Sequence, residues 1–410
     1  MQENISVALV GTLDTKGDEI AYIRGILREN GIEPVVIDVG TLNEPTLLPD
    51  IPRTEVAAAA GTSMENVKRS GDRRLAVETM IKGASVIVGR LHGAGRLSGI
   101  LSIGGGTGTH IGMGIMRTLP LGVPKLMVST VASRDMSMLV GTKDITVMHS
   151  VVDILGLNAI SKRILENAAG AITGMARVSG AVGREKRTIG LTSFGFITEG
   201  AGRVKRMLED LGYEVAAFHA NGTGGMALED LIDQGLIDGV LDLALHEFAD
   251  AMYGGYCGGI GPGRLASAGK RGIPHVVVPG GLDCIVLEFN SPETMPDAVK
   301  GRKVFWYDFR SGVRTSLEDV RALARTIAPR LNASKGPTKL VIPLKGWSEA
   351  DAEGGPLYDP ETNRAFLGEI RAVLRHDIDV VEVDAHINDE EFARVVTSEL
   401  HALMKSSGLV

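Results

Sequence analysis

Two stretches of the chain share one layout, in which an apolar segment, a polar turn, an amphipathic segment, a glycine and a second apolar segment follow one another. The stretches are residues 5–38 and 188–219. This order predicts one βαβ unit in each stretch, and the turn after the first strand of such a unit lies at the carboxyl edge of a parallel sheet. The turns GTLDTKG (residues 11–17) and TSFGFITEG (residues 192–200) are therefore the first places to look for a ligand.

The same alternation continues along the chain and predicts the fold class. Further helical patterns cover residues 73–91, 158–170, 201–211 and 316–331. Predicted strands lie near residues 5–10, 33–38, 98–103 and 124–130 in the first half, and near 188–193, 213–218, 239–243, 274–279, 303–307, 339–343 and 379–383 in the second. We therefore predict an α/β protein with two doubly wound, mostly parallel-sheet (Rossmann-like) domains and a ligand cleft between them. The second sheet is expected to have six or seven strands.

The domain boundary is predicted where apolar periodicity is lost and charge increases, around residues 175–188. A boundary near residue 184 gives an N-terminal domain of residues 1–183 and a C-terminal domain of residues 184–410. The composition, with 44% hydrophobic and 23% charged residues, is that of a globular protein. The net charge of -7, without a cluster of Lys and Arg interleaved with aromatic residues, gives little support for an extended nucleic-acid surface.

Cysteine content and hydropathy predict the compartment. Cys257 and Cys284 are the only cysteines, which excludes a disulfide framework and a CxxC zinc site and favours a reducing cytoplasm. The first residues lack the features of a signal peptide, and no apolar run reaches the length of about 18 residues that a membrane span needs. We expect a cytoplasmic protein without a membrane partner.

The strongest candidate site is the segment LSIGGGTGTHIGMGIM, in which a predicted buried strand runs into a glycine-rich turn and then a helix. The turn consists of Gly104, Gly105, Gly106, Thr107, Gly108 and Thr109. Backbone N–H groups, two hydroxyls and a helix N-terminus are together suited to bind a phosphate or carboxylate. The segment is not a Walker A loop, because no GK[ST] follows. The alternative is a sharp strand-to-helix turn that needs only its glycines.

The turn GTLDTKG supplies a second set of candidates: Gly11, Thr12, Asp14, Thr15 and Lys16. Lys16 could pair with a phosphate, while Asp14 or a threonine hydroxyl could hold Mg²⁺ through water. The alternative is a solvated Lys16 and a capping box formed by Thr15 and Asp18 at the start of the next helix. Gly31 suits the left-handed residue at the end of that helix.

Candidates in the second half lie in two further segments. In HANGTGG, His219 could bind a phosphate or act as an acid, next to a glycine turn with Gly222, Thr223 and Gly224. Equally, His219 could simply bond nearby backbone. Near the C-terminus, Asp384 and His386 point either to the carboxyl edge of the sheet or to a dimer contact. Asn388 and Glu391 are spaced as a capping box for the last helix.

The glycine-rich segment of residues 245–264 is predicted to form a mobile loop over the cleft. Cys257 within it is either a nucleophile or, with better support, a free structural thiol. His246 and Glu247 do not form an HExxH motif, so a zinc protease is unsupported.

A family resemblance covers nearly the whole chain. The ordered motifs GTLDTKG, SGD, GGGTGT, MHSVVDILGLN, TSFG, FHANGTGG, GIGPGRL, GIPHVVVPGGLD, GWSEAD and DAHIND resemble those of the Tm-one-like ATP-binding domain family, named after a tomato protein that confers resistance to tomato mosaic virus. The resemblance implies two α/β subdomains that bind ATP with Mg²⁺ and associate as homodimers. It makes GTLDTKG, GGGTGT and HANGTGG nucleotide-site candidates. The plant protein is expected to continue into a second, barrel-like domain beyond the region of resemblance, so its antiviral role is not transferred.

The function predicted from these observations is ATP binding, with the phosphates held by the glycine- and threonine-rich turns. Whether ATP is hydrolysed, or its phosphoryl group transferred, stays open, and Lys16, His219 and His386 are the candidate catalytic residues. One alternative is an enzyme that acts on a small phosphorylated or carboxylated metabolite. Another is a non-catalytic scaffold that responds to nucleotide.

Overall fold

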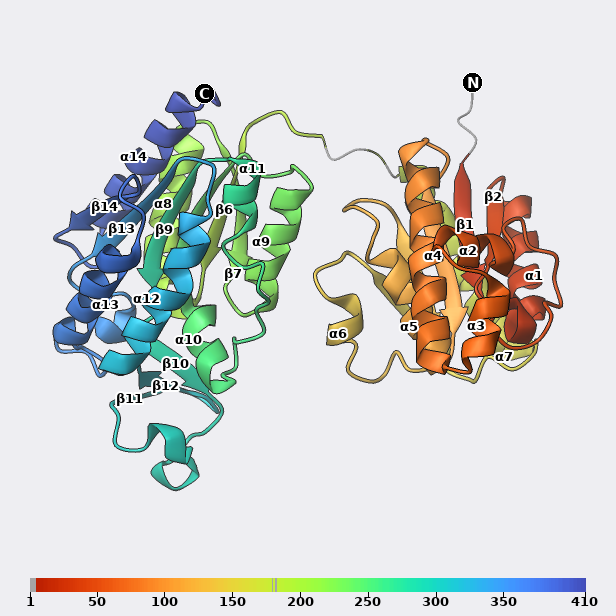
Figure 1. Ribbon diagram of the computed structural model, residues 1–410, viewed down its shortest axis with the longest axis horizontal. Helices are drawn as coiled ribbons and strands as arrows, with labels where there is room; N and C mark the ends of the chain where they lie inside the picture. Colours follow the sequence, from red (N-terminus) through yellow and green to blue (C-terminus); the bar gives the residue numbers. More distant parts are fainter. Residues whose placement is uncertain (1–4, 179, 181–182) are drawn as a thin grey trace. The chain divides into compact units, whose positions relative to one another are not determined.

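The computed structural model describes residues 5–178, 180 and 183–410. Contacts divide the chain into two compact units, Met1–Gly183 and Arg184–Val410, which we call the N-terminal unit and the C-terminal unit. Each unit is a mostly parallel sheet covered by helices on both faces (Figure 1). The predicted fold class, two doubly wound α/β domains, is confirmed.

The N-terminal unit contains a five-stranded sheet in the order β2-β1-β3-β4-β5, with every pair parallel. Its strands are β1 (Ser6–Gly11), β2 (Glu33–Asp38), β3 (Gly99–Gly104), β4 (Lys125–Ser129) and β5 (Thr146–His149). The sequence patterns predicted the first four. They did not indicate β5, because its two end residues are polar and exposed and only the two half-buried residues between them are apolar.

Alternate residues of β1 enter two separate cores, one on each face of the sheet. Val7 and Leu9 pack with α1 (Leu13–Glu29) and α7 (Ala159–Val178). Ala8 and Val10 pack with helices of the opposite face. These helices are α2 (Arg53–Ala59), α3 (Met64–Ser70), α4 (Arg73–Gly93) and α5 (Gly106–Met116), and the short helix α6 (Ser137–Val140) follows β4. The period of two in a strand thus explains why β1 reads as a continuous apolar run.

Helix α1 begins earlier than the sequence indicated. Its N-cap is Thr12, so Thr15 lies inside the first turn and the capping box predicted for Thr15 and Asp18 is wrong. Instead, the N–H group of Leu13 donates to the Asp38 side chain at 3.2 Å. Lys16 departs from helical geometry, with φ −129° and ψ 20°, and kinks the helix. Gly31 adopts the left-handed conformation that was predicted for it, with φ 72°.

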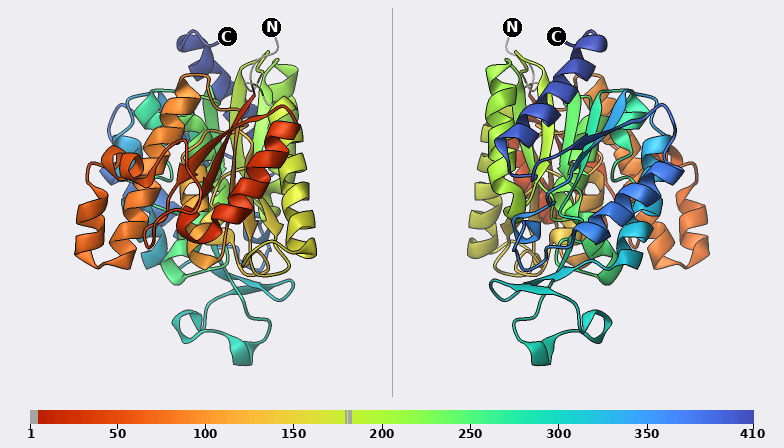
Figure 2. Two further views of the ribbon diagram at one scale, coloured as in Figure 1. Left: turned by 90° about the vertical axis from the view of Figure 1, so that its right-hand side faces the viewer. Right: turned by 90° about the vertical axis from the view of Figure 1, so that its left-hand side faces the viewer.

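The C-terminal unit contains a six-stranded parallel sheet in the order β14-β13-β9-β8-β6-β7. Its strands are β6 (Thr188–Ser193), β7 (Glu214–His219), β8 (Gly239–Ala244), β9 (His275–Gly280), β13 (Thr338–Pro343) and β14 (Asp379–Val383). Helices α8 (Thr198–Asp210) and α14 (Glu390–Ser406) share one core (Figure 2). Helices α12 (Leu317–Asn332) and α13 (Pro360–Val373) share another. Helices α9 (Thr223–Asp233) and α11 (Ser267–Arg271) pack together.

A separate antiparallel sheet belongs to the same unit. It consists of β10 (Cys284–Leu287), β12 (Ser311–Arg314) and β11 (Val304–Trp306), in the order β10-β12-β11. The strand predicted near residues 303–307 therefore exists but is not part of the parallel sheet. Helix α10 (His246–Tyr253) contacts β10. Four 3₁₀ turns complete the unit: Gly195–Ile197, Pro292–Thr294, Asp297–Val299 and Glu349–Asp351.

Helix starts in the C-terminal unit show one further difference from prediction. Asp389, not Asn388, is the N-cap of α14, and it makes no side-chain cap, so the capping box predicted for Asn388 and Glu391 is wrong. The Asn388 side chain instead accepts the N–H of Gly200 at 3.0 Å and donates to the carbonyl of Phe196 at 3.2 Å. Asn388 thus fixes the start of α8. Among the described residues, no helix is long and apolar enough to cross a membrane.

We expect Gly83→Ala to destabilise the N-terminal unit, because a Cβ there would lie 1.9 Å from the Val56 carbonyl oxygen in the neighbouring helix α2. Overpacking of this kind costs about 1–3 kcal/mol. Gly89→Ala is the matched control: it lies in the same helix, and its Cβ would meet nothing within 4 Å. It should stabilise the unit by up to about 1 kcal/mol through helix propensity. Urea unfolding measures both, and shifts of the same sign would contradict this packing.

Candidate functional site

The N-terminal sheet has a switch point between β1 and β3. The chain leaves β1 toward β2 on one side, and the later strand β3 pairs with the other side of β1. In doubly wound sheets, the helices that follow two such strands diverge to opposite faces and open a crevice at the carboxyl edge. Here α1 follows β1 and α5 follows β3, so both glycine-containing turns of this unit meet at that edge.

A pocket of about 260 Å³ lies at this edge. It is lined by residues from the turn after β1, the segment after β2, the start of α4 and the turn after β3. These are Thr12, Asp14, Thr15, Lys16, Thr41, Leu42, Arg73, Val77, Gly104, Gly105, Gly106, Thr107, Gly108 and Ile111. The structure therefore brings two of the three sequence-predicted turns together within one unit.

Gly11 and Thr109, predicted together with these residues, do not line the pocket. Gly11 is buried at the end of β1, where a Cβ would lie 2.8 Å from the Ile20 side chain. The Thr109 hydroxyl is buried and bonds the Ser129 hydroxyl at 2.7 Å and the Gly104 carbonyl at 3.3 Å. Both residues are therefore buried within the fold beside the pocket lining.

The N-terminus of α5 presents backbone donors to the pocket. The N-cap residue is Gly105, which has no side chain to cap the helix. The N–H groups of Gly106, Thr107 and Gly108 have no acceptor among the described residues. Such first-turn amides carry the positive end of the helix dipole. The turn itself requires glycine at position 104, because a Cβ there would lie 2.6 Å from the Gly108 Cα. The two interpretations of this segment, sharp turn and anion site, are therefore compatible.

Two positively charged side chains and one carboxylate line the same pocket as these amides. Arg73 donates to the Thr107 hydroxyl at 3.2 Å, and Lys16 donates to the carbonyl of Ile154. Asp14 accepts the N–H of Leu42 at 2.9 Å through one oxygen, while its other oxygen, Oδ1, is buried without a hydrogen-bond partner among the described residues. The pocket thus combines two positively charged side chains with one carboxylate, one oxygen of which has no hydrogen-bond partner among the described residues.

Arg73 was missed as a site residue by the sequence analysis. It directly follows Asp72, whose side chain caps α4 by accepting the N–H groups of Arg74 and Leu75. This cap fixes the first turn of α4, from which the exposed Arg73 side chain reaches Thr107. The SGD motif was a signal for the helix start, but sequence spacing alone did not connect it with a turn that lies 34 residues away.

The glycine turn of the second half is occupied by the chain itself. The N–H groups of Gly222 and Gly225 donate to Oε1 of Glu247, at 2.9 and 3.1 Å. Asn221 accepts the N–H of Gly224 and the Thr223 hydroxyl, both at 3.1 Å. The structure therefore does not leave the predicted cradle of Gly222, Thr223 and Gly224 free for a phosphate, because an internal carboxylate already binds there.

Glu247 belongs to a fully buried charge network around Arg264. The guanidinium bonds Glu247 at 2.7 Å, Asp242 at 2.5 Å and Glu229 at 3.3 Å. His275 bonds the other oxygen of Asp242 at 2.8 Å. Burial alone would raise the pKa of Asp242, but Arg264 and His275 hold it well below the usual range. Burial would likewise lower the pKa of Arg264, and the facing carboxylates raise it instead.

The predicted histidines both belong to the C-terminal unit. His219 is exposed at the end of β7, and its pKa is lowered, first by partial burial of the ring and then by His246. His386 uses both ring nitrogens: Nδ1 accepts the N–H of Asn388 at 3.2 Å, and Nε2 donates to the Ser348 carbonyl at 2.9 Å. Asp384 is exposed and pairs with Lys345 at 3.1 Å. Neither histidine lines the pocket of the N-terminal unit.

The segment of residues 245–264 was predicted to be a mobile loop over the cleft, and for its first part this prediction is wrong. Its first part is α10, in which His246, Glu247 and Asp250 are fully buried. Cys257 is also buried and forms no disulfide, in keeping with a structural thiol. The burial follows from the internal partners of these polar residues, which hydropathy patterns do not reveal.

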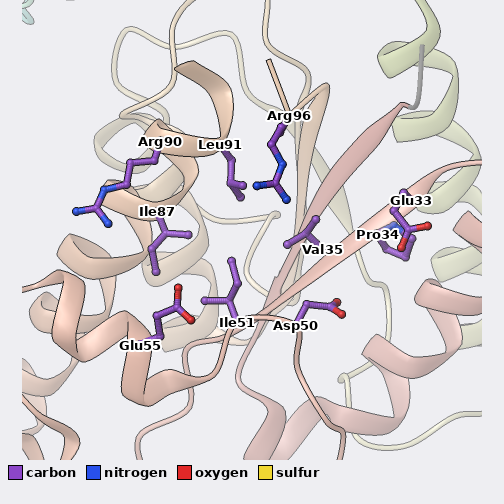
Figure 3. Close-up of a pocket in the computed structure, with 10 residues that line it drawn as sticks. All are labelled: Glu33, Pro34, Val35, Asp50, Ile51, Glu55, Ile87, Arg90, Leu91 and Arg96. Atoms are coloured by element: carbon purple, nitrogen blue, oxygen red, sulfur yellow. The ribbon is translucent and has the colours of Figure 1, made fainter. Parts of the chain in front are cut away.

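A larger pocket of about 490 Å³ lies against the outer strand β2 (Figure 3). Its polar lining mixes acids (Glu33, Asp50, Glu55) with arginines (Arg90, Arg96). It includes the first residues of β2, at the opposite end of that strand from the carboxyl edge. No glycine-rich turn contributes to it, so it has none of the backbone donors that characterise the site between β1 and β3.

Comparison with known proteins supports the family resemblance. Residues 5–181 match the N-terminal domain of the Uncharacterised protein family (UPF0261), and residues 186–404 match its C-terminal domain. A UPF0261 protein of Clostridium tetani is 43% identical over 405 residues, covering 98% of this chain and 100% of that protein. The ToMV susceptible protein tm-1(GCR26) of Solanum lycopersicum is 32% identical over 428 residues, covering 98% of this chain and 56% of that protein.

We expect Glu247→Gln to destabilise the C-terminal unit strongly, because it removes one partner of the buried Arg264 and weakens the acceptor at the start of α9. Breaking a buried pair on one side costs about 3–5 kcal/mol. Glu199→Gln, which breaks an exposed pair with Arg203, is the control and should cost about 0.5 kcal/mol or less. Chemical denaturation measures both, and comparable losses would show that the buried network contributes no more than a surface pair.

Proposed function

The chain belongs to the UPF0261 family, and we propose that its N-terminal unit binds ATP, with the phosphates in the pocket between the carboxyl ends of β1 and β3. The observation that carries the proposal is the start of α5. Three consecutive residues whose amides have no acceptor among the described residues line a pocket that is also lined by Arg73 and Lys16. A ligand with several negative oxygens is the chemistry that this arrangement favours.

The arrangement discriminates against other ligand classes. An uncharged apolar ligand would leave the amides of Gly106, Thr107 and Gly108 unbonded, which costs about 1–3 kcal/mol for each buried donor. An organic cation would face Arg73, Lys16 and the positive end of α5. A phosphate chain supplies an acceptor for every donor, and the arginine can bind two of its oxygens at once.

Asp14 supports a role for Mg²⁺. Its Oδ1 atom is buried without a hydrogen-bond partner among the described residues, within the lining of the same pocket. Mg²⁺ in phosphate sites commonly keeps several waters and uses one or two carboxylates together with phosphate oxygens. Asp14, directly or through water, is therefore the residue that would hold a Mg²⁺ ion, and the ion would neutralise part of the phosphate charge.

The pocket limits how much of a nucleotide it can enclose. At about 260 Å³ it is smaller than the roughly 300–1,000 Å³ of pockets for drug-sized ligands, and no aromatic side chain lines it. We propose that it holds the triphosphate and that the base lies beyond it. Inorganic triphosphate should therefore compete with ATP, and this competition separates phosphate recognition from base recognition.

We expect Arg73→Gln to weaken Mg-ATP binding by about five- to tenfold, since one partly screened charge-assisted contact is worth about 1–1.4 kcal/mol. Arg74→Gln is the matched control: Arg74 is adjacent and exposed, pairs with Glu78 at 2.8 Å and does not line the pocket. Calorimetric titration gives both affinities. At about 100 times its dissociation constant, Mg-ATP should also add roughly 2.7 kcal/mol to the stability of the wild-type protein. Absence of this stabilisation, or equal effects of both variants, would refute the site.

Lys16→Ala addresses whether binding leads to chemistry. One outcome is a variant that folds and still binds ATP, more weakly, but releases no phosphate. That result would favour an ATP-dependent hydrolase or transferase in which Lys16 neutralises charge. Binding without turnover in the wild-type protein would favour a nucleotide-responsive scaffold. Binding of a phosphorylated or carboxylated metabolite without binding of ATP would favour the metabolite enzyme.

A cytoplasmic homodimer is the assembly we propose. The two cysteines, both buried and free, are compatible with a reducing compartment, and the dimer follows from the family resemblance. Light scattering of the purified protein should give twice the chain mass of 43.3 kDa, and a mass of one chain would exclude the dimer.

A further inference from the structure

The C-terminal sheet repeats the switch-point topology, and its switch point holds a cluster of polar side chains. Strands β7 and β8 lie on opposite sides of β6, so the crevice position is at the carboxyl ends of β6 and β8. Phe194 follows β6 and His246 follows β8. Their rings stack with centroids 4.5 Å apart and planes 8° from parallel. The histidine is therefore held rigidly at this position.

Three side chains with metal-binding atoms converge here. His246 and Asp250 are four residues apart on α10 and so lie on one face of the helix. Gly254 then ends the helix in the left-handed conformation, with φ 62°, and the returning chain brings Cys257 back to Asp250. The ligand atoms of His246, Asp250 and Cys257 all lie within 4.8 Å of one another, and all three residues are buried.

The hydrogen bonds of His246 determine which nitrogen faces the cluster. Its Nδ1 lies 3.1 Å from the Gly281 carbonyl oxygen, which can only accept, so Nδ1 carries a hydrogen and donates. Its Nε2 is buried, has no hydrogen-bond partner among the described residues and lies 3.4 Å from Oδ2 of Asp250. A neutral ring would turn a lone pair toward a buried carboxylate. That arrangement requires a positive charge between the two groups.

Hydrogen bonds hold both carboxylate oxygens of Asp250 in place, and Oδ2 can still coordinate a cation. Its Oδ1 accepts the N–H of Val286 at 2.7 Å, and its Oδ2 accepts the N–H of Cys257 at 2.8 Å. Each carboxylate oxygen has two lone pairs, so Oδ2 can still bind a cation. The same hydrogen bond fixes the backbone of Cys257 beside the carboxylate, which is why the thiol reaches the cluster.

We propose that His246 Nε2, Asp250 Oδ2 and Cys257 Sγ bind a divalent cation of the zinc class. Ligands about 2.0–2.1 Å from a tetrahedral zinc are about 3.3–3.4 Å apart, and the observed separation of Nε2 and Oδ2 is 3.4 Å. The mixed nitrogen, oxygen and sulfur set favours Zn²⁺ over Mg²⁺ or Ca²⁺. The bond from Nδ1 to the Gly281 carbonyl is the support that zinc-binding histidines commonly have.

Binding would replace a proton by a metal ion. The Cys257 thiol loses its proton to solvent as the sulfur–metal bond forms, so the carboxylate and the thiolate together neutralise the two charges of the cation. With three protein ligands, a water or small ligand completes the coordination. The cation would fasten the loop of residues 254–264 onto α10. This inference is independent of nucleotide binding in the N-terminal unit.

The competing arrangement is a protonated His246 paired with Asp250. Burial disfavours the imidazolium, but Asp250 and Cys284 outweigh this effect and raise the pKa of His246 well above its usual value. A proton on Nε2 and a metal on Nε2 exclude each other. The experiment must therefore detect the sulfur–metal bond, which the ion pair lacks.

Co²⁺ is a suitable probe, because thiolate coordination to Co²⁺ gives a charge-transfer absorption. The full-length protein is first freed of metal with a chelator and then titrated with Co²⁺. Cys284→Ser is the decisive form, because Cys257 is then the only thiol in the chain. Cys284 lies 3.8 Å from Nδ1, the nitrogen that faces away from the cluster, and so is not a proposed ligand.

We expect one equivalent of Co²⁺ to produce the absorption in both the wild-type protein and Cys284→Ser, and Zn²⁺ to displace it. Cys257→Ser should lose the absorption and bind Co²⁺ at least about 10-fold more weakly, with circular dichroism confirming that it folds. If Cys257→Ser does not fold, Cys284→Ser decides alone. Absence of the absorption in Cys284→Ser, or its retention in folded Cys257→Ser, would overturn the proposal.

Discussion

The first backbone N–H groups of a helix need an acceptor from outside the helix, and the source of that acceptor distinguishes the strand-to-helix turns of the two units. The first turn of a helix cannot bond its own amides, and the carboxyl edge of a parallel sheet concentrates such turns. In α1 the Leu13 amide is bonded by Asp38, and in α9 the amides of Gly222 and Gly225 are bonded by Glu247. In α5 they have no acceptor among the described residues.

This contrast assigns different roles to two turns that look alike. Both are rich in glycine and threonine, and both join a strand to a helix. At α9 the chain supplies its own anion, and the buried charge of Glu247 is in turn balanced by Arg264, which also binds Asp242 and Glu229. At α5 the amides open into a pocket beside Arg73 and Lys16. A ligand anion at α5 would take the place that Glu247 takes at α9.

The C-terminal unit uses its own switch point differently again. There, α10 presents side chains to the crevice position, and His246 and Asp250 are fully buried. The charges of His246 and Asp250 are balanced by each other or by a cation. Glu247, the next residue of the same helix, instead bonds the start of α9 and Arg264. One short helix therefore links the buried ion network to the His246, Asp250 and Cys257 cluster. The glycines around Cys257 allow the close approach of the loop, since a Cβ at Gly258 would lie 2.9 Å from the Ala251 amide nitrogen.

Local patterns determined the fold class, because alternating apolar strands and amphipathic helices have few packing solutions other than a doubly wound sheet. The same patterns placed the turns of residues 11–17 and 104–109 at the carboxyl edge, where the structure joins Thr12, Asp14 and Lys16 with Gly104–Gly108. Short-range signals failed at helix starts, since Thr12 and Asp389, not Thr15 and Asn388, are the N-caps.

What tertiary structure alone decided is the partner of each polar group. Nothing in the spacing of Glu247 and Gly222, 25 residues apart, indicates that one would bond the other, and nothing near Thr107 in the sequence points to Arg73. Helix starts and buried charges are satisfied by whichever group the packing brings close, because a hydrogen bond depends on distance in space and not along the chain. The sequence by itself determined where donors would gather; only the folded chain decided which of them are left for a ligand.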